Sequence, residues 1–466
     1  MVEARPREQA SEPASGLQPG TAVIAAIPVL TLIDLLRQPR WGPWAMLAAI
    51  AVFVGMQASR VTPGVRRTCV LLGLITAALL PGLADPLPSL QRGIRIGGLI
   101  ASLLVAVNLL SCAASRVRRV RQVLGALYRL PAGQRYFGLS VASQFFGGLL
   151  GLAGIAMMME AAARQDGFDA QQKTSSFAAI ARGYSALSLW SPMYSNMGIV
   201  LGLYPGTNWA LVLPVALAVT ALFILLGTVM DRFARPASEE SGSQSGALWR
   251  QGWPVILGML CFLGFMIVTS QGLGMPIAAV IIAAAPLAAW LVNAWLLRTP
   301  RLAPGAGARQ VVSDMAGFRV MAGEVLMFLA SGCAGTVIGS AIPSAWTAAI
   351  GQGVAGSPGL AAFTVSAAIV LMSATAIHPM LSAVIIGSSL SPEQVGLPLL
   401  VHLTAVLVGW GLAIIVTPFS VLSLMASRWS GVHVLVISLR ANAGFVLLAL
   451  AASSFLLGST ARLISP

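Results

Sequence analysis

Four short polar stretches interrupt long apolar runs of this sequence, and their residue types suit the binding of a small ion or solute. Each holds hydroxyl, amide, proline or histidine side chains within an otherwise apolar run. Polar groups at membrane depth have no water to bond to, so such stretches persist where protein buries them or where they line a wet cavity. The predicted binding residues are, in chain order, Ser143, Gln144 and Gly147; Ser191, Pro192, Ser195 and Asn196; Ser373, Thr375, His378 and Pro379; and Thr417, Pro418 and Ser420.

Two of these stretches predict helices that are broken within the membrane. The letters SPMYSN begin at Ser191, and TPFS begins at Thr417. Proline has no N–H and clashes with the preceding turn, so it frees carbonyl groups before the break, and the half-helix that follows exposes its own N–H groups. Carbonyl groups suit a cation, whereas the N-terminus of a half-helix favours an anion through its dipole. We therefore expect an anionic, carboxylate-like solute between the two breaks.

The other two stretches predict the tips of re-entrant hairpins. The first tip lies within a segment at about 138–163, and the second within a segment at about 359–391. His378 comes directly before a proline at the second tip, and histidine titrates near neutral pH, which makes it a candidate proton carrier or anion partner. The alternative is a neutral histidine that bonds to a freed carbonyl group.

Several other polar residues of the apolar runs are candidates for a role. Arg182 and Arg440 are candidate anion partners, with extension to the lipid headgroups as the alternative. His402 and His433 lie near predicted helix ends, where we expect an interfacial position. The four cysteines stand singly and lack the spacing of metal ligands, so no metal site is expected.

The elements that must position these residues follow from composition. The chain has 466 residues, of which 57% are hydrophobic and 9% charged, whereas soluble domains carry about 25% charged residues. Apolar runs of about 20 residues recur, each long enough to cross the hydrocarbon of a bilayer. The net charge of +14 resides in arginines of the short loops, which is typical of cytoplasmic loops rather than of nucleic-acid binding. We predict an all-α polytopic protein of a bacterial inner membrane, with a cytoplasmic N-terminus.

The order of runs and loops predicts two repeats around a scaffold. The connector at 116–136 carries six arginines, whereas no Lys or Arg occurs from Val320 to Ser427. Equivalent connectors that differ in this way face opposite sides, as in an inverted-topology repeat; the alternative is that one loop is simply basic. The predicted segments are a disordered tail at 1–20, scaffold helices at 21–94, repeat 1 at 95–230 with a broken helix at 175–203, a cytoplasmic linker at 231–251, scaffold helices and a basic loop at 252–319, repeat 2 at 320–457 with a broken helix at 398–427, and a C-terminal tail at 458–466.

This order of helix, connector, hairpin, proline-broken helix and final helix resembles the ion transporter superfamily, which includes divalent anion sodium symporters, citrate carriers and the membrane subunits of arsenite pumps. The stretches at Ser191–Asn196 and Thr417–Ser420 look like degenerate versions of the Thr-Pro-Pro-Asn-like motif of those symporters. The Ser-Asn-Thr triplet of the symporter hairpin tips is absent here. The resemblance implies alternating access and a homodimer, but the missing triplets leave sodium coupling open.

The predicted function is therefore secondary active transport of a small anionic solute, coupled to a proton or sodium gradient and without another cofactor. Beyond the bilayer and the solute, the expected partner is a second copy of the chain, with no nucleic acid. Two alternatives stay open. One is a membrane enzyme that acts on a lipid-linked substrate, although no catalytic triad or phosphate-binding glycine loop stands out. The other is a non-transporting membrane subunit that works with a partner ATPase.

Overall fold

The protein is a bundle of helices that exposes apolar side chains. A computed structural model describes residues 19–165, 167–204, 207–234, 245–297, 305–354, 356–375, 377–418 and 420–464. No strand occurs among these residues, and nine of their helices are long and apolar enough to span a membrane. Val268 is 72% exposed and Phe455 77% exposed, as expected where lipid rather than water surrounds the protein. The all-α polytopic membrane fold is thus confirmed.

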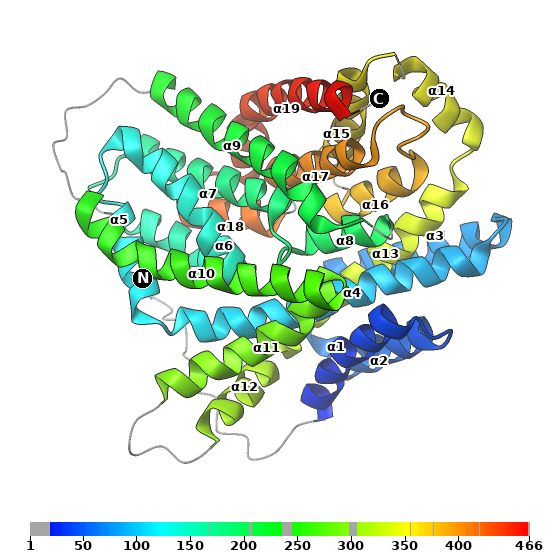
Figure 1. The fold of residues 1–466 in the computed structure, drawn as a ribbon, viewed down its shortest axis with the longest axis horizontal. Coiled ribbons are helices and arrows are strands. Elements are labelled where there is room, and N and C mark those ends of the chain that lie inside the picture. The colour runs from blue at the N-terminus through cyan, green and yellow to red at the C-terminus, as the bar shows by residue number, and fades with distance from the viewer. Residues whose placement is uncertain are drawn as a thin grey trace.

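The scaffold combines the first four helices with the middle of the chain. In Figure 1, α1, α2, α11 and α12 lie together on one side of the long helix α4, and the hairpins and broken helices lie on its other side. The scaffold helices are α1 (Pro19–Arg37), α2 (Gly42–Met56), α3 (Pro63–Leu79), α4 (Pro86–Ser115), α10 (Ser245–Leu273), α11 (Ile277–Leu296) and α12 (Ala306–Gly317), with 3-10 turns at Ala58–Arg60, Leu80–Gly82 and Phe318–Met321.

The other helices form two series in the same order: a connector helix, a hairpin, a broken helix and a final helix. The first series is α5 (Arg118–Leu127), α6 (Ala132–Ala163), α7 (Ala170–Trp190), α8 (Ser195–Leu203) and α9 (Trp209–Ala234). The second follows α13 (Ala322–Ala341) and is α14 (Ser344–Val354), α15 (Pro358–Ala374), α16 (Pro379–Ser389), α17 (Leu399–Val416), α18 (Val421–Ser430), a π-helix at Val436–Arg440 and α19 (Ala443–Ile464).

The two series keep one register from end to end. The Ser185 hydroxyl donates to the carbonyl oxygen of Gly411, a residue that lies 226 positions later in the chain. Helix α6 begins at Ala132 and α15 at Pro358, and this is the same separation. The same separation of 226 residues relates the starts of α5 and α14, the ends of α7 and α17, and the starts of α8 and α18. Residues 185 and 411 are therefore equivalent, and they touch where α7 meets α17.

Local contacts repeat with the same register. The Ser140 hydroxyl donates to the Ala179 carbonyl at 3.2 Å, and the Ser366 hydroxyl donates to the Ala405 carbonyl at 2.8 Å. Both pairs are 39 residues apart in sequence. Each bond joins the first arm of a hairpin to the first half of the following broken helix. The two series thus share the same order of helices, the same spacing and the same local contact.

Helix α4 belongs to the scaffold and also leads into the first series, as α13 leads into the second, and α4 and α13 pack against each other in opposite directions. Ser89, near the start of α4, lies 3.2 Å from the hydroxyl oxygen of Ser340, near the end of α13. Further along α4, a methyl group on Gly97 would lie 2.7 Å from the Cα of Leu329. Glycine is required there because the two backbones approach so closely.

The first hairpin turns at Gly151, not at the predicted tip between Ser143 and Gly148. Gly151 has φ of 56° and ψ of −144°, a combination that only glycine adopts readily. A methyl group on Gly154 would lie 2.5 Å from the Phe146 carbonyl oxygen, although eight residues of continuous helix would separate them by about 12 Å. The predicted reversal exists, but the tip was placed several residues too early.

The helices also extend beyond several expected boundaries. Helix α7 begins at Ala170, because Asp169 and Gln172 form a capping box. Helices α9 and α10 include the two ends of the linker predicted at 231–251. Helix α12 lies within the predicted basic loop. Helix α19 continues to Ile464, where a tail was predicted. Residues 1–18 and 235–244, Ala376 and Phe419 lie outside the described residues.

Candidate functional site

The first proline break is held by two tryptophans. Helix α7 ends at Trp190, and the predicted residues Ser191 and Pro192 are buried in the break that follows. The indole of Trp209 donates to the freed carbonyl of Trp190 at 2.9 Å. The indole of Trp190 donates in turn to the side-chain oxygen of Gln144 at 2.8 Å. The break is thereby fixed to the hairpin arm α6 and to the start of α9.

Helix α8, which follows this break, offers hydrogen-bond donors at its N-terminus. It begins at Ser195, and no side chain caps its first turn. Asn196, in that turn, is 2% exposed, and its amide nitrogen has no hydrogen-bond partner in the described part of the chain. A helix N-terminus with unused donors is a favourable site for an anion.

The second break differs in its capping. Thr417 is fully buried, and Pro418 follows it, as the sequence predicts. The hydroxyl of Ser420 accepts a hydrogen bond from the Ser423 N–H at 3.0 Å and so caps α18. The N-terminus of α18 is therefore capped by a serine side chain, whereas the N-terminus of α8 has no side-chain cap. The two half-helices thus differ in the N–H groups that they leave for an anion.

The residues predicted for the first hairpin tip lie instead in the first arm of α6. The Ser143 hydroxyl donates to a carbonyl of its own helix at 2.8 Å. The side-chain amide of Gln144 donates to the Gly183 carbonyl. A methyl group on Gly147 would lie 2.6 Å from the ring of Tyr184, so this glycine permits close helix packing rather than a turn.

The second hairpin turns where the sequence predicts. The Ser373 hydroxyl donates to the hydroxyl oxygen of Ser382 on the opposite arm at 3.2 Å, and Thr375 stands exposed at the tip. The Nδ1 atom of His378 accepts a hydrogen bond at 3.3 Å from the backbone N–H two residues later, and Pro379 begins α16. His378 thus caps α16 by accepting from a backbone N–H, whereas the alternative predicted a bond to a freed carbonyl group.

The two arginines predicted as anion partners lie elsewhere. Arg182 is buried and donates to Asn442 at 3.1 Å, to the Tyr136 hydroxyl at 3.1 Å and to the Ala441 carbonyl at 2.9 Å. It therefore joins α7 to the segment before α19. Arg440 is exposed on the π-helix. Neither side chain lines a described cavity.

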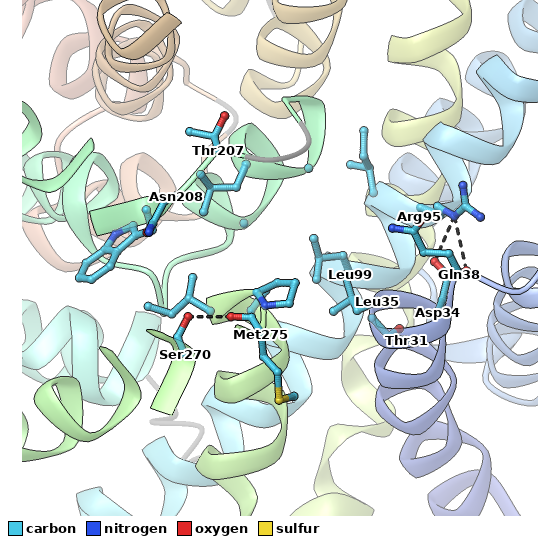
Figure 2. A pocket seen from close by; sticks show the side chains of 18 of the residues that line it. Thr31, Asp34, Leu35, Gln38, Arg95, Leu99, Thr207, Asn208, Ser270 and Met275 are labelled. Atoms are coloured by element: carbon cyan, nitrogen blue, oxygen red, sulfur yellow. Dashed lines mark hydrogen bonds and ion pairs between the residues drawn. The ribbon is translucent and has the colours of Figure 1, made fainter. Parts of the chain in front are cut away.

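A cavity of about 850 Å³ lies between the scaffold and the first repeat. Figure 2 shows its two walls facing each other across the opening. Helices α1 and α4 form one wall, whereas α8, the segment before α9, the end of α10 and the start of α11 form the other. The labelled residues of the first wall are Thr31, Asp34, Leu35, Gln38, Arg95 and Leu99, and those of the second are Thr207, Asn208, Ser270 and Met275.

The charges of this cavity come from three residues. The Nε atom of Arg95 lies 3.1 Å and 3.4 Å from the two carboxylate oxygens of Asp34. The Asp34 side chain is 6% exposed and that of Arg95 is 40% exposed. The carboxylate of Asp34 is therefore more deeply buried than the guanidinium of Arg95. Arg92 also lines the cavity and is exposed. One acid against two arginines leaves the lining with a net positive charge.

The described residues that line this cavity include none of the predicted binding residues, but the cavity adjoins the first break. Gly198 and Gly202 of α8 belong to its wall, and so does Trp209, the residue whose indole holds the break. Asp34 and Arg95 were missed as candidate residues in the sequence. The signal was present, because ionisable residues within or at the start of apolar runs mark functional sites.

His402 lies in the first turn of α17 and is fully buried. The Tyr204 hydroxyl donates to the Gly387 carbonyl at 2.9 Å, and its oxygen lies 3.1 Å from Nδ1 of His402. The hydroxyl has one proton for these two acceptors, so the tautomer of the His402 ring depends on which of them receives it. The Nε2 atom of His402 is buried and has no hydrogen-bond partner among the described residues.

No family model matches the sequence, and no curated protein matches it significantly. Solved structures do match. The YdaH transporter of Alcanivorax borkumensis is 17% identical, with a TM-score of 0.55 over 86% of this chain and 98% of that one. MtrF of Neisseria gonorrhoeae, which belongs to a class of antimetabolite efflux pumps, is 13% identical with a TM-score of 0.43, over 97% of this chain and 96% of that one. The first of these likenesses shows that this chain has the fold of the YdaH transporter.

Proposed function

We propose that the protein is a secondary active transporter that moves a small organic anion, carboxylate-like in charge, across a bacterial inner membrane by alternating access. The observation that carries this proposal is the positively charged cavity between scaffold helices α1 and α4 and half-helix α8. The fold shared with the YdaH transporter supports transport as the general activity.

The charge of the cavity favours an anion. Arg95 is partly neutralised by Asp34, whereas Arg92 has no hydrogen-bond or ion-pair partner within the described part of the chain. Walls of low polarizability strengthen the attraction between an arginine and a carboxylate. A guanidinium also binds a carboxylate through two parallel hydrogen bonds. Apolar side chains such as Leu35 and Leu99 line the rest of the space, so the solute has an apolar body as well as its charged group.

The cavity leads toward the first break along α8. Its wall includes Gly198 and Gly202, which present backbone rather than side chains to the solute. The N-terminus of α8 and the unused amide of Asn196 lie further along the same half-helix. In this proposal an arginine binds the carboxylate first, and the donors at the N-terminus of α8 bind it next. Ser191 and Ser195 are further proposed ligands of the substrate.

The alternating access proposed here relies on two repeats of opposite orientation, and the packing of the helices supports that orientation. Helices α4 and α13 run antiparallel although they hold the same place in their repeats. Ser185 meets its own equivalent, Gly411, as residues near a two-fold axis do. We include in the proposal that the chain is a member of the ion transporter superfamily, that the arginine-rich connector and the N-terminus face the cytoplasm, and that the protein is a homodimer.

In this proposal the coupling ion is a proton, and His402 is the residue that supports it. His402 is a buried titratable side chain between repeat 1, which supplies Tyr204, and repeat 2, and its Nε2 atom has no hydrogen-bond partner among the described residues. Glu393, in the exposed loop before α17, is the nearby acid. Hydrogen bonds from its own backbone N–H and from Ser391 hold the pKa of this carboxyl below its usual range, so it is ionised.

Uptake into proteoliposomes tests the proposal. The purified protein should accumulate at least one labelled mono- or dicarboxylate from a broad panel when a proton gradient is imposed, with a sodium gradient run in parallel. Arg92→Gln should raise the KM for that anion about 10-fold or more, since a hydrogen bond to a charged group contributes roughly 1.5–3 kcal/mol.

The matched control is Arg67→Gln, which removes an exposed arginine of α3 outside the cavity. This variant should transport like the unchanged protein. Absence of accumulation for every anion under both gradients would reject the transporter, and an unchanged KM in Arg92→Gln would reject the cavity as its anion site.

A further inference from the structure

A second cavity, of about 650 Å³, lies between α5, α6, α9 and α10, away from the arginines of the first. Its lining is almost wholly apolar and includes Phe137, Phe145 and Phe146. Phe137 is 46% exposed, and Leu225 and Val229, on the α9 side of the cavity, are 57% and 47% exposed. The cavity therefore has an open apolar margin on the lipid-covered part of the protein.

Helix α5 contributes an apolar face to this cavity and a basic face to its surroundings. Val123 and Leu127, four residues apart on one face of the helix, line the cavity, and so does Leu130 in the turn that follows. Arg118 and Arg129, at the two ends of this segment, are exposed. A short helix with this pattern lies at the boundary between headgroups and hydrocarbon.

One cation lies at the cavity itself. Arg232, in the last turn of α9, lines the cavity and is exposed. It has no hydrogen-bond or ion-pair partner among the described residues. The neighbouring Asp231 accepts a hydrogen bond from Ser175 on α7 at 2.6 Å. No acidic residue is among the described residues that line the cavity. An anionic group bound to Arg232 would therefore meet no repulsion from the lining.

We propose that this cavity binds one acidic phospholipid, with an acyl chain between α5, α6 and α9 and the phosphate on Arg232. An acyl chain gains little by leaving other lipid for an apolar cavity, so the charge on Arg232 decides which headgroup is retained. Basic pockets between membrane helices on the cytoplasmic side are typical sites for acidic headgroups. The bound chain fills the space between the connector helix α5 and the first hairpin arm, and so stabilises their packing.

Native mass spectrometry and thermal unfolding of the full-length protein in neutral detergent test this site. The probes are phosphatidylglycerol and phosphatidylcholine with the same acyl chains, and glycerol 3-phosphate as a headgroup without chains. The unchanged protein should retain phosphatidylglycerol several-fold better than phosphatidylcholine and unfold at a higher temperature with it. Glycerol 3-phosphate should not raise the unfolding temperature.

Two variants separate the headgroup from the chain. Arg232→Gln should reduce phosphatidylglycerol retention to the level of phosphatidylcholine, and Val229→Trp, which fills the open margin, should reduce retention of both lipids. The matched controls are Arg428→Gln, an exposed arginine at the end of α18, and Val268→Trp, an exposed position of α10 outside the cavity. Both controls should retain lipid as before.

Several results would overturn the proposal. Equal retention of the two lipids by the unchanged protein would exclude an acidic-lipid site, and so would unchanged retention in Arg232→Gln. Stabilisation by glycerol 3-phosphate equal to that by phosphatidylglycerol would show a phosphate site without an acyl chain. Because lipid retention is measured without any solute, these outcomes are independent of whether the protein transports an anion.

Discussion

The buried carboxylate of Asp34 shows how one residue sets the chemistry of the first cavity. This carboxylate accepts a hydrogen bond from Nε of Arg95, so that the rest of the guanidinium stays available to the cavity. A buried acid without this partner would be costly in a membrane protein. The sequence contains both residues in apolar runs, but they are 61 positions apart. Their pairing depends on the packing of α1 against α4, which residue spacing alone does not reveal.

His402 is the residue whose replacement should change coupling most. His402→Gln keeps an amide group that can bond to the Tyr204 oxygen but removes the titratable imidazole ring. We expect the variant to lose accumulation driven by a proton gradient and to keep exchange of labelled for unlabelled anion. Uptake and exchange measured in the same proteoliposomes check this.

The control for this prediction is His433→Gln, at an exposed position after α18, which should accumulate anion normally. Accumulation by His402→Gln equal to that of the unchanged protein would show that the coupling proton resides elsewhere, and His378 would then be the next residue to replace.

At the scale of elements, the broken helices were predictable and the first hairpin tip was not. A proline within an apolar run breaks a helix through its own missing N–H, so Pro192 and Pro418 mark both breaks directly. Glycines are ambiguous, because they serve both close packing and turns. Gly147 packs against Tyr184, whereas Gly151 makes the turn. The sequence does not distinguish these uses without the neighbouring helix.

The hairpin turn gives a stability prediction. Gly151 has positive φ, and no atom lies within 4 Å of the place that an alanine methyl group would occupy, so Gly151→Ala adds backbone strain without a clash. We expect the free energy of unfolding to fall by about 1–3 kcal/mol, the cost of holding a non-glycine residue in this region. Thermal unfolding in detergent measures the change.

Gly125→Ala provides the comparison, because Gly125 is helical, exposed and equally uncrowded. Alanine is favoured over glycine in a helix by about 0.5–1 kcal/mol, so this variant should be as stable as the unchanged protein or more stable. Equal stability of the Gly151→Ala and Gly125→Ala variants would contradict a turn at Gly151.

At the scale of the whole molecule, the repeat was predictable from the order of runs, but the solute cavity was not. The positions of the prolines, 192 and 418, already have the separation of 226 residues that the structure extends to whole helices. The cavity, in contrast, is assembled from α1, α4, α8, α10 and α11, which are distant in the chain. Its walls come mainly from the scaffold, whereas the sequence pattern predicts a site between the four interruptions.

Opposite orientation of the repeats is the premise of alternating access, and cysteine labelling tests it most directly. After replacement of the four native cysteines, Gln122→Cys on α5 and Gln352→Cys on α14 place single thiols at exposed positions of equivalent helices. In intact cells a membrane-impermeant maleimide should label only the variant at 352, and in inside-out vesicles it should label only the variant at 122. Labelling of both thiols from the same side would contradict the inverted repeats and the transport mechanism built on them.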